Sequence, residues 1–574
     1  MGSSDVDESI DGSDDGDTHD PVSELWWEET DNNSSSSDLN SGGMSDDSEE
    51  DSEDDLKSIG QDTNKSFFQL PNTLVELRKR LLGDYVLPTE PPHQSAGVRT
   101  LTASEILSLQ HYVAWRKSNG TVYAYKLHAN VLAMASKMEI LSQHHAKMLA
   151  QILTDFVPRM VDMCPRSCIA YTGVYESLKK CPYVHGKDIC NEQRYHDPTS
   201  SGRLIPRAQV QILPVMATIR AMFANAETGR LLCNRNSCLQ AALHLVGTAA
   251  TRKYSDFGNS QVHVMQHNKL GLFQDPRDVA FAISTDGAQL TMKKQSNTWL
   301  MILIILNLPS SIRYQTNNVI INFATPGANS PGDIESFIWM LFQEMAMASE
   351  GIWMWDAIDS SHFVHRSCVV MALGDMLGSA KLNGMAGHTA IFGDRFSMVQ
   401  GAKSSLIKGV KSQYYPMDPP ENDRYNPSRP PRYDLSRIPM RSQATYWETI
   451  ERLGAATTKK ERSEITKATG VSRLPLCAAS VAFMHPTFFP LDPFHLFYEN
   501  IMAFIWDIWT VLSKSGEIVH LPAEKAQELG RLVALAMSTL PPAFCGPIRD
   551  PYLKRQSQYK VYEWMALLHW YIIQ

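Results

Sequence analysis

Three short apolar runs with strand-like patterning follow one another in the middle of the chain, separated by polar or proline-containing turns. Runs of this kind predict strands joined by loops. Residues 333–348 then repeat apolar positions at helical spacing, with Asp333 near the start, where an acid suits the helix dipole. A fourth strand and a short helix that runs through Asn383 follow. The predicted strands cover residues 279–290, 298–308, 318–323 and, after the long helix, 366–374.

The predicted order of these segments is β-β-β-α-β-α, which is the order of a ribonuclease H-like core. In that topology the first and fourth strands are neighbours, so Asp286 and Asp375, near the ends of these strands, come together. Two carboxylates about 4 Å apart repel by roughly 4 kcal/mol at an effective dielectric constant near 20. We therefore expect a divalent cation to hold both of them ionised at neutral pH.

The remaining patterning predicts a mixed α/β protein of several parts. Residues 1–62 are rich in Ser, Asp, Glu and Gly and bury too little apolar surface to fold. Apolar positions at helical spacing predict helices at 127–143, 146–156 and 215–224, and a charged helix around 446–467. The predicted parts are a disordered acidic tail (1–62), a helical N-terminal region (63–160), a Cys-rich module (161–200), a connector (201–275), the first part of the ribonuclease H-like core (276–390), a mostly helical insertion (391–550) and a C-terminal helix completing the core (551–574).

Charge is distributed unevenly along the 574 residues. Of the 62 acidic residues, 21 lie in residues 1–56, which contain no Lys or Arg. The rest of the chain has 53 basic against 41 acidic residues, a net charge of about +12, whereas the whole chain has −9. This asymmetry indicates nucleic acid as a partner, and a solvated basic surface is the alternative.

Basic residues alternate with tyrosines in the first part of the predicted insertion. Lys and Arg contact phosphates and aromatic rings stack on bases, so the stretch is a candidate nucleic-acid surface. A plain proline-rich loop is the competing interpretation. The candidate phosphate contacts are Lys403, Lys408, Lys411, Arg424, Arg429 and Arg432.

The nine cysteines are an odd number spread over a chain whose first 20 residues have no apolar signal sequence. This predicts a reducing compartment, in which clustered cysteines bind metal rather than form disulfides. The longest apolar stretch, residues 299–306, is about half of a membrane span, so we expect no membrane insertion. The cysteines are Cys164, Cys168, Cys181, Cys190, Cys233, Cys238, Cys368, Cys477 and Cys545.

Several short motifs occur in a specific order in the second half of the chain. They are STDGAQL (284–290), W-x6-LNLP (299–309), RY (313–314), TPG (325–327), ESF (335–337), ALGDMLGSAKLNGMAGH (372–388) and QYYP (413–416). As an ordered series they resemble the Tnp2 family, the transposases of CACTA-type (En/Spm-like) DNA transposons, and most of all its fungal branch. The resemblance runs from about residue 160 to the C-terminus.

The resemblance implies a ribonuclease H-like DDE/D domain that cuts DNA at transposon ends and joins it to a target with Mg²⁺ or Mn²⁺. Asp286 and Asp375 match the first two acids of the family. For the third acid we favour Glu563, in a K-x-x-E-W segment on an amphipathic helix. Asp492, in LDPFHLFYEN, is the alternative third acid. If Glu563 is the ligand, Asp492 and His495 have a structural or supporting role at the site.

The segment CPRSC-x12-CPYVHGKDIC (164–190) resembles a small zinc-binding module of the same family. Cys164, Cys168 and Cys181 fit as thiolate ligands, and a tetrahedral site requires a fourth. Val184 stands where the family usually has the closing cysteine, so either His185 or Cys190 completes the set. Relatives also have two cysteines where this chain has Asp394 and Met398, and they commonly continue well beyond Gln574.

Three hypotheses follow from the sequence. The first is a nuclear transposase that binds transposon ends and target DNA, self-associates, uses two Mg²⁺ or Mn²⁺ ions and carries a structural zinc ion. The second is a truncated, inactive relic that only binds DNA or chromatin. The third is an acidic-tailed regulatory interaction protein. The distance from Asp286 and Asp375 to a third acid separates the first hypothesis from the second.

Overall fold

The computed structural model describes residues 73–92, 100–197, 202–246, 253–288, 298–326, 329–387, 389–402, 415, 431–536, 546–554 and 559–572. The predicted tail, 1–62, lies outside these residues. The N-terminal region is helical, as predicted. The two helices predicted there, at 127–143 and 146–156, differ from the observed ones in their limits, because Lys137 has a left-handed backbone (φ 56°) that ends one helix and Ser142 caps the next. The helices are α3 (Leu74–Leu82), α4 (Ala103–Lys117), α5 (Val122–Ser136) and α6 (Gln143–Thr154).

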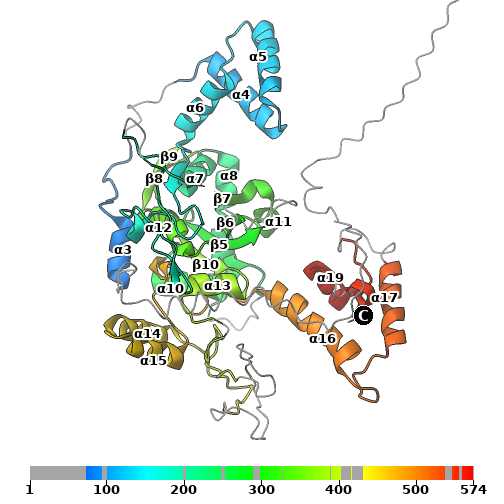
Figure 1. Cartoon of the computed structure of the whole chain (residues 1–574). Coiled ribbons are helices and arrows are strands. Elements are labelled where there is room, and N and C mark those ends of the chain that lie inside the picture. The colour runs from blue at the N-terminus through cyan, green and yellow to red at the C-terminus, as the bar shows by residue number, and fades with distance from the viewer. Residues whose placement is uncertain are drawn as a thin grey trace, which may run out of the picture. The chain divides into compact units, whose positions relative to one another are not determined.

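A six-stranded mixed sheet forms the centre of the fold, in the order β1-β4-β7-β6-β5-β10. Figure 1 shows its strands β7, β6, β5 and β10. The mixed α/β class is thus confirmed, and the four predicted strands are adjacent in the order that a ribonuclease H-like core requires. That finer assignment stays a prediction, with which the sheet is compatible. The strands are β1 (Arg159–Asp162), β4 (Gln209–Ile212), β5 (Val279–Ala288), β6 (Thr298–Ile305), β7 (Val319–Ala324) and β10 (Ser367–Leu373).

The two strands β1 and β4, which sequence patterning did not predict, extend the sheet at β7. Each has four residues, too few to show a clear alternation. β1 pairs antiparallel with β4, and β4 pairs with β7 through Gln211 and Ile212. The Cys-rich segment lies between these two strands in the sequence, so both ends of that module are anchored in the sheet.

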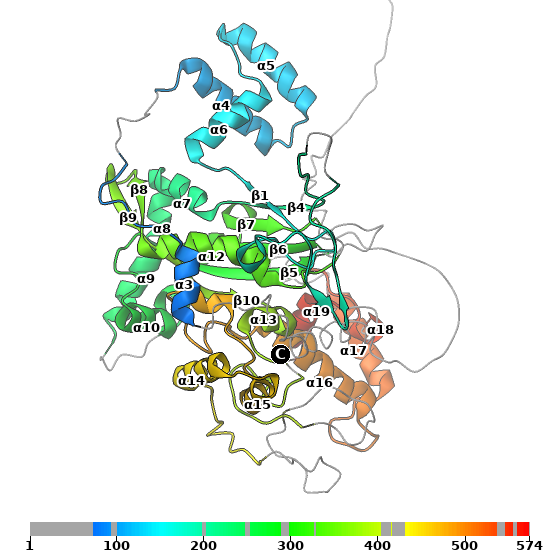
Figure 2. The ribbon, with the colours of Figure 1, turned by 60° about the vertical axis from the view of Figure 1, so that its left-hand side comes forward.

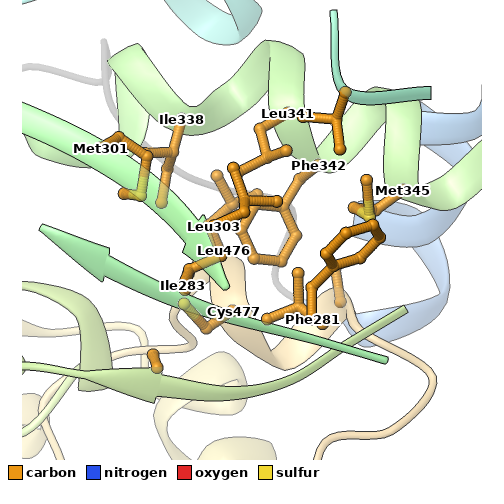
Figure 3. Close-up of a cluster of buried hydrophobic side chains, with 14 of the residues drawn as sticks. Phe281, Ile283, Met301, Leu303, Ile338, Leu341, Phe342, Met345, Leu476 and Cys477 are labelled. Atoms are coloured by element: carbon orange, nitrogen blue, oxygen red, sulfur yellow. The ribbon is translucent and has the colours of Figure 1, made fainter. Parts of the chain in front are cut away.

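The core on one face of the sheet is formed with α12 (Ile334–Glu350), which lies across the strands (Figure 2). Alternate residues of a strand point to the same face, and Phe281 and Ile283 accordingly share this side. The opposite face packs Ala280, Ala282 and Cys368 against Phe257 and Phe273. Figure 3 shows the α12 side, where the labelled contacts are Phe281, Ile283, Met301, Leu303, Ile338, Leu341, Phe342, Met345, Leu476 and Cys477.

Between α12 and β10 the chain forms a hairpin that the sequence reading missed. β8 (Ile352–Asp356) and β9 (Ser361–His365) pair antiparallel in a separate two-stranded sheet. The helices before β5 include α7 (Val215–Phe223), which matches the helix predicted at 215–224, α8 (Ala226–Leu232), α9 (Asn234–Leu243) and α10 (Gln261–Leu270). Of these, α7 contacts β8 and α12 and, like α8, contributes to the core on the α12 side, whereas α9 and α10 contact the Phe257 segment of the opposite face.

The helix predicted around 446–467 is two helices, because Thr458 caps a new helix and accepts a hydrogen bond from the Glu461 amide. The C-terminal helices form a separate apolar cluster around Trp506 and Trp564.

No helix in the described part of the chain is long and apolar enough to cross a membrane. The remaining helices are α11 (Ser310–Arg313), α13 (Met376–Asn383), α14 (Gln443–Ala455), α15 (Lys459–Thr469), η6 (Phe494–Met502), α16 (Ala503–Asp507), η7 (Ile508–Leu512), α17 (Ala523–Ala536), α18 (Pro551–Lys554), α19 (Val561–Ala566) and η9 (Leu567–Ile572).

Candidate active site and metal centre

Asp286 and Asp375 lie at the C-terminal ends of two neighbouring parallel strands. Leu373, the last residue of β10, pairs with Ser284 of β5. Each aspartate follows its paired residue by two positions, so both lie at the same edge of the sheet. The negative charge of Asp375 acts on the carboxyl group of Asp286. The structure therefore brings the first two predicted acids together.

Each of these carboxylates is oriented through one oxygen atom. Asp286 Oδ1 accepts a hydrogen bond of 2.7 Å from the Gly287 amide, and Asp375 Oδ1 accepts one of 2.5 Å from the Gly378 amide at the start of α13. In the described part of the chain, no hydrogen bond reaches Oδ2 of either aspartate. Anchoring one oxygen while leaving the other available is the arrangement that a metal-binding carboxylate requires.

Gly378 allows α13 to begin close to the end of β5. A Cβ atom at this position would lie 2.9 Å from Asp375 Oδ1 and 3.5 Å from the Thr285 carbonyl oxygen. The first contact is closer than real Cβ atoms adopt. Glycine at this position therefore lets the helix cap by Asp375 form next to β5, which is one reason why the two aspartates meet.

The electrostatics at this edge disfavour two negative charges. Burial and the charge of Asp375 raise the pKa of Asp286, while the Gly287 amide and His495 lower it, and the net pKa is raised. The Asp286 residue is exposed at the surface, although neighbouring groups still remove part of the water around its carboxyl group. A bound divalent cation would relieve the repulsion between the two carboxylates.

A third acidic group comes from the start of η6, far along the chain. Asp492 Oδ2 lies 2.6 Å from His495 Nδ1, and Glu499 Oε2 lies 3.4 Å from His495 Nε2. Partial burial lowers the pKa of His495, but Asp492, Glu499 and Asp375 raise it above its usual value. His495 interacts electrostatically with both Asp375 and Asp286. Among the described residues, however, the ligand atoms of Asp286, Asp375 and Asp492 do not form a group within 4.8 Å of one another.

Glu563 lies in a different environment, in the apolar cluster of the C-terminal helices. Its side chain is fully buried, and Arg549 Nη2 lies 2.7 Å from Oε2. The Arg549 amide and Nε both donate to Oε1, and the Lys560 amide donates to Oε2. Both oxygens of Glu563 are therefore engaged within this cluster.

The sequence reading did not single out Glu499 or Arg395 in this region. Glu499 lies one turn after His495, a spacing that could have indicated it. Arg395 donates hydrogen bonds to Ser379 and to the Pro490 carbonyl, both far away in the sequence. Such tertiary contacts leave no local pattern, so only the structure reveals the position of Arg395.

The Cys-rich module contains a four-cysteine cluster. Ligand atoms of Cys164, Cys168, Cys181 and Cys190 all lie within 4.8 Å of one another. Cys190 Sγ lies 3.7 Å from Cys164 Sγ and 3.6 Å from Cys168 Sγ. A tetrahedral zinc site with Zn–S bonds of about 2.3 Å has sulfur atoms about 3.8 Å apart, whereas a disulfide brings them to about 2.05 Å. The four thiols therefore fit a structural zinc ion.

Of the two candidates for the fourth ligand, Cys190 belongs to this cluster. His185, in the short hairpin formed by β2 (Val184–His185) and β3 (Asp188–Ile189), places its Nε2 3.1 Å from Cys168 Sγ. That position suits a hydrogen bond to a thiolate ligand. Hydrogen bonds from Cys168 and Cys181 lower the pKa of the Cys164 thiol, whereas the same hydrogen bonds to Cys164 raise the pKa values of Cys168 and Cys181. One thiolate therefore forms readily, and a bound cation would be needed to hold the other thiols deprotonated.

The cysteine cluster is packed against the first turn of α12. The Cys168 carbonyl accepts a hydrogen bond of 2.8 Å from the Asp333 amide. The Tyr175 hydroxyl donates to Asp333 Oδ2 at 2.6 Å, and the Ser336 hydroxyl accepts from the Ala170 amide. Since α12 covers the sheet, the module supports the core rather than standing apart from it.

The predicted nucleic-acid surface falls mostly outside the described residues. Of the six basic residues predicted for it, only Arg432 is described, and it is exposed. The other five, Lys403, Lys408, Lys411, Arg424 and Arg429, lie outside the described residues, as does Cys545.

A comparison with known families matches the segment that contains the aspartate pair. Residues 259–416 match the transposase family tnp2. The tnp2 match spans β5 to α13 and includes both Asp286 and Asp375. Asp492, Glu563 and the four-cysteine cluster lie outside it. No curated protein matches the chain.

Proposed function

We propose that this protein is a DNA transposase of the CACTA type, from the fungal branch, which cuts DNA at transposon ends and joins it to a target with Mg²⁺ or Mn²⁺. The observation that carries this proposal is the placement of Asp286 and Asp375 at one sheet edge, inside the segment that matches the tnp2 family. When bound, two divalent ions activate a water or a 3′-hydroxyl group and stabilise the leaving oxygen.

In this proposal Asp286 and Asp375 are metal ligands through Oδ2, while the amides of Gly287 and Gly378 keep each carboxylate in position. Asp492 is the third acid that we favour, because His495 links it electrostatically to the pair. Glu563 remains the other candidate for the third acid. It is less suited to bind metal, since metal binding would break its hydrogen bonds to Arg549 and Lys560.

We further propose that Cys164, Cys168, Cys181 and Cys190 hold a structural zinc ion. DNA at transposon ends and at the target is the proposed partner, and Arg432 with the neighbouring basic residues would contact its phosphates. Acting on chromosomal DNA, the protein would work in the nucleus, and joining two transposon ends favours self-association.

The catalytic proposal is tested by nicking of supercoiled plasmid DNA by the purified full chain with Mn²⁺. We expect Asp286→Asn and Asp375→Asn to lower the nicking rate about 100-fold or more, since lost metal stabilisation is worth several kcal/mol. Asp434→Asn, at an exposed aspartate, is the matched control and should nick as fast as the wild type. Absence of nicking by the folded wild-type chain would favour the inactive DNA-binding relic.

A further inference from the structure

Arg395 connects the two segments that carry the candidate catalytic acids. Its Nη1 donates hydrogen bonds to Ser379 Oγ at 2.8 Å and to the Pro490 carbonyl oxygen at 3.2 Å. Pro490 precedes Asp492 by two residues. The guanidinium group therefore holds the start of the Asp492 segment against α13, the helix that Asp375 caps.

The α13 end of this connection leads directly to Asp375. The Ser379 hydroxyl donates to the Gly374 carbonyl oxygen at 3.0 Å, and the Ser379 amide donates to the Asp375 carbonyl oxygen at 3.0 Å. Ser379 is buried. A short series of hydrogen bonds thus runs from Pro490 through Arg395 and Ser379 to the backbone on both sides of the Gly374–Asp375 bond.

The other edge of Arg395 has no partner among the described residues. Neither Nε nor Nη2 donates a hydrogen bond to a described residue, and no carboxylate of the described chain lies within 4.0 Å. Burial lowers the pKa of Arg395, and the charges of Asp394, Asp375 and Asp492 oppose that effect. Arg395 is thus a partly buried cation near three carboxylates, without a direct ion pair to any of them.

A buried charge without a direct partner is costly, and an anionic ligand would supply the missing one. The Nε and Nη2 atoms of arginine lie on one edge and donate two parallel hydrogen bonds, a geometry that matches two oxygens of a phosphate group. The candidate site acts on phosphodiesters if the proposed function holds. Arg395 is fixed through Nη1, which leaves the Nε–Nη2 edge for a ligand.

We propose that Arg395 binds a DNA phosphate next to the candidate metal site through its Nε–Nη2 edge, while its Nη1 positions Asp375 and Asp492. The proposal rests on the proposed function for the identity of the ligand, a DNA phosphodiester. It assigns Arg395 two tasks that a lysine cannot combine, because one ammonium group cannot contact Ser379, Pro490 and a phosphate in that geometry.

The test measures binding of a 30-base-pair fluorescent DNA duplex to the full chain in Ca²⁺ at several KCl concentrations, alongside plasmid nicking in Mn²⁺. Each phosphate contact contributes about 0.9 to the slope of log affinity against log salt concentration. Arg395→Ala should lower that slope by about 0.9 and nicking at least about 10-fold. Arg395→Lys should keep the slope, because the charge remains, but should also nick at least about 10-fold more slowly.

Arg78→Ala is the matched control, because Arg78 is a partly buried arginine whose Nε and Nη2 donate to the carbonyls of Ala479 and Ser480. It should lower the melting temperature without changing the salt slope. An unchanged slope in a folded Arg395→Ala variant, or wild-type nicking by Arg395→Lys, would overturn the proposal. A lower slope for Arg395→Ala with no nicking by the wild type would instead reject the catalytic function and leave the phosphate contact standing.

Discussion

At the scale of single residues, the two candidate third acids differ in what surrounds them. Asp492 is partly exposed and interacts with His495, whereas Glu563 is fully buried against Arg549. A carboxylate that binds metal must have an oxygen available, and a carboxylate that pairs with a buried arginine mainly stabilises the fold. The two residues therefore have opposite expected phenotypes.

Asp492→Asn should abolish plasmid nicking while changing the free energy of unfolding by less than about 1 kcal/mol, because asparagine also caps helices. Glu563→Gln should lower that free energy by about 2 kcal/mol, because it leaves the Arg549 charge without its partner. Urea unfolding and nicking rates measured on both variants check this. The assignment fails if Glu563→Gln is as stable as the wild type but inactive, and Asp492→Asn is active.

At the scale of structural elements, the cysteine module is inserted between β1 and β4 and packs on α12. Cys181→Ser and Cys190→Ser should each lose one equivalent of zinc and lower the melting temperature by several degrees, because metal binding stabilises the folded module. His185→Ala should retain its zinc. Elemental analysis with thermal denaturation measures both effects, and zinc loss only in His185→Ala would contradict the four-cysteine site.

The junction after α15 depends on Gly470. This residue has φ 73°, and a Cβ atom here would lie 1.9 Å from the Phe392 carbonyl oxygen. Gly470→Ala should therefore lower the free energy of unfolding by about 2–4 kcal/mol. Gly271 caps α10 with φ 66° and has open space around it, so Gly271→Ala should cost only about 1 kcal/mol. Equal effects of the two variants in urea unfolding would refute the proposed clash.

The elements that sequence patterning predicted are those with long periodic runs. β5, β6, β7, α12 and β10 were located because their apolar residues face the core on one or both sides. The β8–β9 hairpin was missed because each of its strands has only five residues, too few to give a clear periodic run. The helix around 446–467 was predicted as one, although a capping threonine divides it. Helical periodicity alone does not show where one helix ends and the next begins.

The candidate site was only partly predictable. Asp286 and Asp375 were found because one lies near the end of a recognisable strand and the other just after one, and topology then places them together. The positions of Asp492, Glu499 and Arg395 depend on how residues 389–402 and 490–499 fold back onto α13. Arg395 contacts Ser379, 16 residues away, and Pro490, 95 residues away, so no local pattern reveals these contacts.

At the scale of the whole molecule, three buried histidines make stability depend on pH. Burial lowers the pKa values of His263, His365 and His485 to about 3. The unfolded chain binds protons at these sites near pH 6.5, so stability is full above that pH and falls as the pH decreases toward 3.

Between pH 7 and pH 5 each of these histidines should lower the free energy of unfolding by up to about 2 kcal/mol. Urea unfolding at the two pH values measures the total. His263→Gln should make the dependence on pH less steep, with His569→Gln, at a residue of the C-terminal helices, as the control. Equal stability at pH 7 and pH 5 would show that the histidines do not stay neutral in the folded state.

The central claim is that Asp286 and Asp375 hold divalent metal at the edge shared by β5 and β10. Replacing Mg²⁺ with Fe²⁺ and adding ascorbate and peroxide generates radicals that cut the backbone next to the bound ion, and mass spectrometry locates the cuts. We expect cuts near residues 286, 375 and 492, which Asp286→Asn and Asp375→Asn remove. Cuts near residues 549–563 with none near 286 or 375 would contradict the account.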